Sequence, residues 1–176
     1  MACDHIDEVV AQWHQEMPGL DHSPVEVIGR ITRLAQLLDR EIEPVLSGHG
    51  LSGGEFAVLA ALRRAGAPYQ LTPAGLTRSL MVTSGGMTKR LAALQQRGLI
   101  SRETAAADRR SLPVTLTAAG KDLVDAIMHD HLANERRLLA GLDGATQHDL
   151  ARLLRQAALA LGDRAGRQQP ARHTGR

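Results

Sequence analysis

Apolar side chains recur at helical spacing along most of the chain, and polar side chains fill the positions between them. Because residues three and four apart lie on one side of a helix, this pattern predicts amphipathic helices. The predicted helices cover residues 4–17, 23–44, 52–65, 72–80, 83–98, 117–140 and 146–161. A chain of 176 residues built in this way fits one compact domain, or one domain with an extended dimer-forming portion.

Cap residues predict where these helices begin and end. Ser23 and Ser52 each precede a glutamate by three residues, which is the capping-box pattern, and Pro24 suits the first helical position. The other predicted caps are Thr72, Thr83, Thr117 and Thr146. Pro44 is expected to close or kink the second helix, because proline lacks the N–H group that continues a helix.

Two short strands are predicted after Gly98, at residues 99–104 and 112–116. Gly98 is expected to end the preceding helix in the left-handed conformation. Apolar and polar residues alternate in the second strand, which is typical of a half-buried position. Pro113 cannot donate to a sheet ladder, so this strand is expected at a sheet edge. Residues 65–70 are expected to form a loop.

Composition narrows both the core and the type of partner. Only Trp13, Phe56 and Tyr69 are aromatic, so the core must be aliphatic. The formal net charge is only +2, but residues 83–112 carry six cations and two anions, a net +4. A local positive patch of this kind attracts phosphate even when the whole chain is almost neutral.

The predicted helix at 83–98 has one apolar and one polar side. The apolar side carries Met87, Leu91 and Leu94. A helix in the major groove, ~12 Å wide, needs small residues near the bases and a few hydrogen-bonding side chains. The candidates to contact DNA from the polar side are Ser84, Thr88 and Lys89. The alternative is a helix face that is simply exposed to solvent.

A basic tip lies between the two predicted strands. Asp108 can accept hydrogen bonds from nearby backbone or guanidinium groups and stiffen the turn. Arg109 and Arg110 can then reach a minor groove, where narrow walls concentrate negative potential. The alternative is an exposed charged turn. The set of residues predicted to contact DNA is completed by Thr72, Arg78 and Thr83.

Taken together, these features resemble the MarR family of winged helix-turn-helix transcription factors, over about residues 25–162. The most specific part is RLAALQQRGLISRETAAADRRSLPVTLTAAG, which has the family's order of helix end, Gly-Leu-Ile, Asp-x-Arg wing and Leu-Thr-x-x-Gly. The resemblance implies an α+β, mostly α fold and an obligate homodimer with interlocked N- and C-terminal helices. Two winged lobes would read a pseudo-palindromic duplex, so we expect a transcriptional regulator, in the first place a repressor.

The resemblance also predicts how the chain is divided. Residues 1–50 are expected to support dimerisation and to extend an effector site, and residues 51–116 to bind DNA. Residues 117–163 are expected to form further dimerisation helices. Residues 164–176 are polar and rich in Gly, Gln and Arg, so they are expected to form a disordered tail.

Arg90 is unusual on the predicted DNA-reading helix, because it lies between the apolar side and the solvent. A partly buried guanidinium needs a counter-charge or several acceptors; the alternative is that Arg90 turns along the helix to a phosphate. The segments GEFAVLAALRRAGAP and SLMVTSGGMTKRL, with the N-terminal helix, resemble the urate-responsive, PecS-like branch of the MarR family. This closer resemblance implies that Trp13, Arg90 and Arg102 bind a small organic anion that lowers DNA affinity. Ala57 stands where that branch has an aspartate, so urate, another carboxylate and a phenolic compound all stay open as effectors.

Three other classes of function are alternatives to an effector-responsive DNA-binding protein. A redox switch would have to use Cys3, which lies beside Asp4 with no nearby cation to stabilise a thiolate. A metal sensor would need ligand spacing that is not recognisable among the histidines and acids, which include His5, Asp7, His14, His49, His129 and His131. A dimeric interaction module would leave Lys89 and the basic tip without a role.

Neither an enzyme nor a membrane protein is expected. The chain shows no Ser-His-Asp set, no paired carboxylates for catalysis and no phosphate-cradling loop, so neither enzymatic activity nor a cofactor is predicted. No uncharged apolar run approaches the ~18 residues of a membrane span, and the acidic N-terminus lacks a signal-peptide pattern. With a single cysteine and no disulfide, we expect a cytoplasmic protein.

Overall fold

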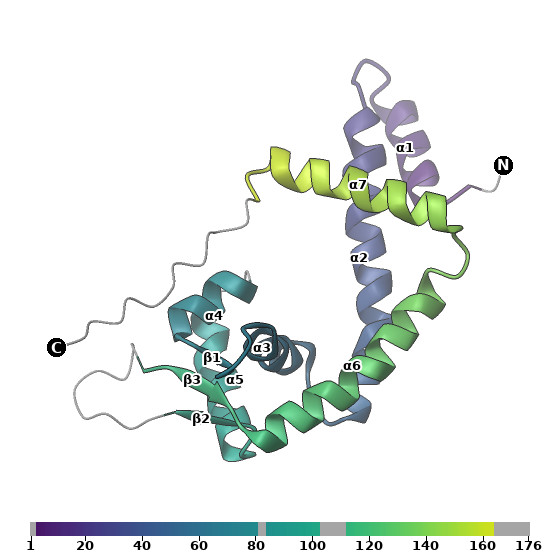
Figure 1. Cartoon of the computed structure of the whole chain (residues 1–176). Coiled ribbons are helices and arrows are strands. Elements are labelled where there is room, and N and C mark those ends of the chain that lie inside the picture. The colour runs from purple at the N-terminus through teal and green to yellow at the C-terminus, as the bar shows by residue number, and fades with distance from the viewer. Residues whose placement is uncertain (1–2, 81–83, 103–111, 164–176) are drawn as a thin grey trace. The chain divides into compact units, whose positions relative to one another are not determined.

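The computed structural model describes residues 3–80, 84–102 and 112–163 (Figure 1). The helices are α1 (His5–Glu16), α2 (Ser23–Gly48), α3 (Gly53–Arg64), α4 (Pro73–Leu80), α5 (Ser84–Gln96), α6 (Ala118–Leu138) and α7 (Gly144–Ala160). The strands are β1 (Gln70–Leu71), β2 (Ile100–Arg102) and β3 (Val114–Leu116). The chain splits into two compact units, Met1–Glu135 and Arg136–Arg176. The predicted α+β, mostly α class is confirmed.

Close helix packing and ion pairs hold α1 against the first half of α2 (Figure 1). A Cβ placed on Gly29 would stand 3.1 Å from Ile6 Cδ1, so the missing side chain lets the two helices come together. Arg30 Nε donates to Asp4 Oδ2 at 2.8 Å, and Asp4 caps α1 by accepting from the Asp7 N–H at 2.9 Å. The hydrogen bond from Arg30 lowers the pKa of Asp4 below its usual value.

The start of α2 differs from the prediction, and so does one of the two outcomes predicted for Pro44, the closing of the helix. Ser23 is the first helical residue rather than the cap, and its N–H and Oγ donate to Asp21 at 3.0 and 3.1 Å. The capping box at Ser23 is therefore wrong, because a carboxylate two residues earlier forms a tighter local turn with the same N–H. Pro44 does not close α2, which runs on to Gly48. A proline in the last turns removes only one donor from the helical ladder.

The capping box at the start of α3 is confirmed. The Glu55 N–H donates to Ser52 Oγ at 3.3 Å, and the Ser52 N–H donates to Glu55 Oε2 at 2.9 Å. The second of these hydrogen bonds is the main cause of a lowered pKa at Glu55. From this start, α3 runs through the centre of the core and contacts α2, α4, α5 and β3.

The core is aliphatic, as the composition predicts, and it lies mainly within residues 51–116, which we call the lobe. Its largest fully buried side chains are Leu51, Val58, Leu59, Leu62, Leu76, Leu94, Ile100, Val114, Val124 and Ile127, the last two from α6. Phe56 is the aromatic member of the buried cluster, and Tyr69 packs against its edge. The lobe therefore gains most of its stability from burying apolar surface.

The three-stranded sheet has the order β1-β3-β2, and both pairings are antiparallel. β3 is therefore the central strand, and its predicted edge position is wrong. The cause is β1: Gln70, within the segment predicted as a loop, pairs with Thr115. Pro113 precedes the strand, so it takes no donor from the ladder.

Hydrogen bonds connect the residues that follow α5 to the start of α6, although two strands separate these helices in the sequence. Gly98 has a φ of 68°, which confirms the left-handed helix end. Thr117 Oγ1 donates to the Gly98 carbonyl at 2.8 Å and accepts from the Gly120 N–H at 3.0 Å, so the predicted cap at Thr117 is confirmed. A Cβ on Gly120 would overlap the Leu99 carbonyl. Only a glycine fits where these two elements meet.

The second unit contains α7, whose N-cap is Asp143. The Thr146 N–H donates to Asp143 Oδ1 at 2.7 Å. The predicted cap at Thr146 is therefore wrong, because Asp143 is the cap. A carboxylate accepts such a hydrogen bond more strongly than a hydroxyl does. Gln147 Nε2 donates to the carbonyls of Leu139 and Leu142, which ties the preceding turn to α7. No residue of α7 is buried.

Among the described residues, no single helix has the length and apolar character needed to cross a membrane. The bent pair α2 and α3, which meet at 76°, meets the length and composition criteria only when the two helices are taken together.

Candidate nucleic-acid interface and adjoining pocket

The helix α5 buries one side and exposes the other, as its sequence pattern predicts. Met87, Leu91 and Leu94 are 3%, 2% and 0% exposed and belong to the core. Thr88 and Lys89 are exposed, and Lys89 forms no ion pair with any residue that the structure describes. The helix thus presents a hydroxyl and a cation on a face that the lobe does not use for packing.

Thr72 and Arg78 lie at the two ends of α4, which contacts α5. Thr72 Oγ1 accepts a hydrogen bond from the Gly75 N–H at 3.1 Å, so Thr72 caps α4 as predicted and remains exposed. Arg78 is exposed in the last turn. The structure therefore places these two residues on α4, and Thr88 and Lys89 lie on α5, the helix that α4 contacts.

Several predicted site residues cannot be placed in the same way. Thr83, Asp108, Arg109 and Arg110 lie outside the described residues. Ser84 begins α5, but its side chain is also outside what the structure describes. The roles of these five residues stay predictions.

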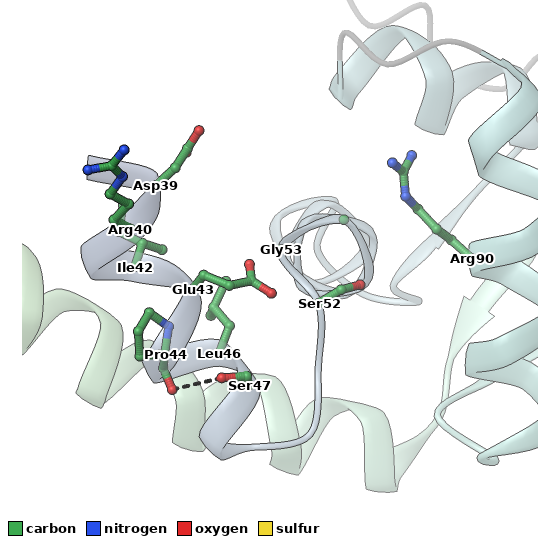
Figure 2. A pocket seen from close by; sticks show the side chains of 11 residues that line it. Asp39, Arg40, Ile42, Glu43, Pro44, Leu46, Ser47, Ser52, Gly53 and Arg90 are labelled. Atoms are coloured by element: carbon green, nitrogen blue, oxygen red, sulfur yellow. Dashed lines mark hydrogen bonds between the residues drawn. The ribbon is translucent and has the colours of Figure 1, made fainter. Parts of the chain in front are cut away.

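A hollow of about 890 Å³ opens beside α5, between the C-terminal half of α2 and the first turn of α3 (Figure 2). It is lined by Asp39, Arg40, Ile42, Glu43, Pro44, Leu46, Ser47, Ser52, Gly53, Gly54 and Arg90. Figure 2 shows Glu43 on one side of the α3 axis and Arg90 on the other. The hollow therefore combines two carboxylates and two guanidinium groups with an apolar floor.

Arg90 is partly buried, which agrees with its predicted position between the two sides of α5. It forms no hydrogen bond or ion pair within the described parts of the chain. A guanidinium shielded from water without a partner is a strong site for an anion, because an added carboxylate supplies the missing acceptors. Of the predicted effector residues, Arg90 is the one that lines the hollow.

The other two predicted effector residues, Trp13 and Arg102, do not line this hollow. Trp13 lies on α1, is 46% exposed and stacks beside His22 with 6.4 Å between ring centroids. Arg102 ends β2. Neither residue lines the hollow, and neither does Ala57. The pocket residues Asp39 and Glu43, in contrast, were not identified from the sequence, because exposed acids on a long helix give no local signal of a pocket.

An ion cluster outside the pocket was also missed by the sequence analysis. Asp125 accepts from Arg63 Nε and from Lys121 Nζ, both at 2.7 Å. These hydrogen bonds, first that from Arg63, lower the pKa of Asp125 to about 2. The Arg63 guanidinium also lies 5.2 Å from the centroid of the Tyr69 ring. The spacing of Lys121 and Asp125 is a recognisable helical pair, whereas the contact with Arg63 joins distant parts of the chain.

Two histidines near the core lie close to acids. His49 Nε2 lies 2.8 Å from Asp130 Oδ2, and His131 Nε2 lies 3.2 Å from Glu135 Oε1. Within the described ranges, no three metal-ligating side chains come together. Cys3 is exposed.

The lobe thus combines two contacting helices, α4 and α5, with a small sheet, and α5 exposes a polar face. A model of the MarR family matches residues 49–111. The HTH-type transcriptional regulator PecS of Dickeya dadantii is 38% identical over 149 residues, which cover 85% of this chain and 90% of PecS. The chain belongs to the MarR family. The predicted family, and its resemblance to the PecS-like branch, are confirmed.

Solved structures of MarR-family proteins agree with this assignment. Mycobacterium tuberculosis Rv2887, in complex with p-aminosalicylic acid, is 30% identical and superposes with a TM-score of 0.60, covering 75% of this chain and 98% of Rv2887. Streptomyces coelicolor Sco3205, in complex with DNA, is 21% identical with a TM-score of 0.70, covering 86% of this chain and 95% of Sco3205. The second comparison shows a common fold. MarR-family membership makes this chain a DNA-binding transcriptional regulator, and its named relatives are regulators, not enzymes.

Proposed function

We propose that this chain is a homodimeric repressor that binds a pseudo-palindromic DNA site and releases it when a small organic anion enters the pocket at Arg90. The observation that carries the proposal is the two-sided helix α5. Its apolar side holds it in the lobe, and its opposite side exposes Thr88 and Lys89. A rigid helix with a small polar face and one cation suits a major groove.

Dimerisation is supported by apolar side chains that the isolated chain leaves in solvent. The large hydrophobic residues that are exposed between residues 13 and 37 are Trp13, Met17, Leu20, Val27, Ile28, Ile31, Leu34 and Leu37. A second group comprises Leu132, Leu139, Leu142, Leu153, Leu154, Leu159 and Leu161. Exposed apolar surface on this scale marks an interface, and a second copy of the chain is the partner that a pseudo-palindrome requires.

An anionic effector is supported by the guanidinium of Arg90 at the wall of the pocket, which has no partner among the residues that the structure describes. Rv2887 has been solved in complex with p-aminosalicylic acid, a small carboxylate. Ala57 provides no carboxylate to compete for Arg90, so we place carboxylates first and urate second among the probes. Trp13 and Arg102 remain proposed effector residues, with Trp13 reaching the ligand from the dimer interface.

The DNA-binding proposal is tested by fluorescence anisotropy with duplexes taken from the region upstream of the gene. Lys89→Ala is expected to weaken the preferred duplex by about 1–3 kcal/mol, roughly five- to 150-fold in Kd, and to change the sequence preference. Arg64→Ala removes an equally exposed charge from the end of α3 and serves as the control. An unchanged affinity and preference in Lys89→Ala would show that α5 does not read the bases.

The effector is tested in the same assay. p-Aminosalicylate or urate, titrated into the protein–DNA complex, is expected to release the labelled duplex. The ionic strength is kept constant during the titration, because salt alone weakens phosphate contacts. The anion should then release the duplex although the salt concentration does not change.

A further inference from the structure

Two glycines on different helices have the same neighbour. If a Cβ were placed on Gly54 of α3, it would overlap Arg90 Nε and lie 2.9 Å from Arg90 Cζ. If one were placed on Gly86 of α5, it would lie 3.1 Å from Arg90 Nη1 and 3.2 Å from Cζ. At both positions the three nearest atoms all belong to Arg90. The guanidinium therefore occupies the space that side chains at 54 and 86 would fill.

Backbone conformation does not explain either glycine. Neither Gly54 nor Gly86 has the positive φ that favours glycine, and both lie inside helices, where glycine loses more backbone entropy than alanine. Gly53 is an informative contrast, because it is the neighbouring residue in the same helical turn. A Cβ on Gly53 would lie 3.5 Å from Glu43 Oε2, an ordinary contact distance. Space is therefore limiting at Gly54 and not at Gly53.

The same arrangement links the pocket to the DNA-reading helix. Arg90 belongs to α5 and lines the pocket, whereas Gly54 belongs to the first turn of α3, which forms another part of the pocket wall. Ala57 lies one turn further along α3, on the same side as Gly54, and provides no carboxylate there. Arg90 is therefore held by shape, with no acidic partner among the described residues.

We propose that Gly54 and Gly86 form a notch that positions the Arg90 guanidinium at the pocket wall, and that this notch sets the sensitivity of the protein to a carboxylate effector. The inference rests on the proposed effector function and names the residues that tune it. Gly54 and Gly86 act through Arg90 and are positioning residues. A carboxylate that pairs with the guanidinium stabilises one placement of Arg90 and therefore one placement of α5 against α3.

Gly54→Ala is the sharper test, because Gly86 lies on the DNA-reading helix itself. The displaced atoms are the end of a flexible side chain, so we expect the variant to fold with Arg90 moved out of the notch. Gly53→Ala is the matched control: it makes the same substitution one residue earlier in the same helix. Both variants are made with Arg90 present and with Arg90→Ala.

The first measurement is the urea unfolding midpoint. With Arg90 present, Gly54→Ala should have a lower midpoint than Gly53→Ala. In the Arg90→Ala background, both substitutions should raise the midpoint by similar amounts, because alanine favours a helix over glycine. If Gly54→Ala and Gly53→Ala shift the midpoint equally in both backgrounds, there is no notch and the proposal is overturned.

The second measurement is release of labelled DNA by p-aminosalicylate and by urate. Gly54→Ala should need about tenfold more of the active anion for half-release, a change worth about 1.4 kcal/mol, with little change in DNA affinity when no anion is present. Gly48→Ala, at an α2 position outside the hollow where an added Cβ meets nothing within 4 Å, should behave like the parent, and Arg90→Ala should not release DNA. If the parent responds and Gly54→Ala responds equally, the notch has no role in sensing. If the parent responds to neither anion while the unfolding midpoints show the coupling, the effector function fails, and the notch is then a packing feature only.

Discussion

The lobe and the long N-terminal helix bury their apolar residues to very different extents. In the lobe, Leu59, Leu62 and Leu76 are completely buried, and no large hydrophobic side chain among its described residues is strongly exposed. In α2, Leu46 is the one buried residue, while Val27 and Ile28 are each 59% exposed. The lobe thus buries its large apolar side chains in the core, whereas α2 carries an apolar face that is exposed among the described residues. The contrast separates residues that fold the chain from residues that, in the proposed dimer, pair it with another copy.

The largest effect is expected from charging the uncovered face of α2. Ile28→Glu together with Ile31→Glu should give a monomer, because two carboxylates cannot be buried unpaired in an interface. Operator affinity should fall by about 10²–10⁴-fold, since the second lobe no longer binds at a high effective concentration. Sedimentation velocity and anisotropy measure the two effects. Gln36→Glu, on the opposite side of α2, is the control, and a stable dimer in the double variant would contradict the comparison.

A smaller effect distinguishes core burial from interface burial. Leu59→Ala should destabilise the protein by about 2–5 kcal/mol, because it leaves a cavity in a fully packed site. This loss should not depend on protein concentration in the range where the protein is dimeric. Leu34→Ala, at a position 44% exposed in the isolated chain, should destabilise dimerisation and so become more harmful as the protein is diluted. Urea unfolding at two concentrations measures both, and equal dilution effects for both variants would contradict the distinction.

The smallest effect concerns the contact between the lobe and α6. The pKa of Asp125 is lowered from 3.8 to about 2, so its pairing with Arg63 and Lys121 stabilises the fold above about pH 4 and is lost as pH falls through 2. Asp125→Asn should lower the unfolding midpoint at pH 7 but make it less sensitive to acid between these limits. Because the cluster is solvent-accessible, the loss should be modest. Asp122→Asn removes a neighbouring carboxylate of α6 from outside the cluster, and an identical pH profile in both variants would exclude a role for the pairing.

Local features of the fold could be predicted from the sequence. The capping box at Ser52 and Glu55 and the two-sided pattern of α5 depend on residues within one or two turns, and both were confirmed. The errors arose where another residue competed or where distant segments met. Asp21 and Asp143 displaced the predicted hydroxyl caps, and β1 paired with β3 across more than forty residues, as in Gln70 with Thr115. Local features were predictable where no nearby carboxylate competed for the same N–H, and pairing between distant segments was not.

The candidate site divides along the same line. The exposure of Lys89 and the partial burial of Arg90 follow from their positions on one helical wheel. The pocket itself does not, because its wall combines α2, α3 and one residue of α5. The sequence could not show that Gly54 stands against Arg90, and the expectation that Trp13 and Arg102 join Arg90 was based on family resemblance rather than on contacts within one chain.

The junction of Gly98, Leu99, Thr117 and Gly120 has a mechanical consequence. Thr117 Oγ1 donates to the Gly98 carbonyl and the Thr117 N–H donates to the Leu99 carbonyl. With the glycine-only contact at Gly120, these hydrogen bonds leave no slack between the residues that follow α5 and the first turn of α6. A tilt of α6 is therefore transmitted to α5, the helix that we propose reads DNA, instead of being absorbed by a flexible joint. In the proposed dimer, the placement of α6 would then set the angle at which α5 enters a groove.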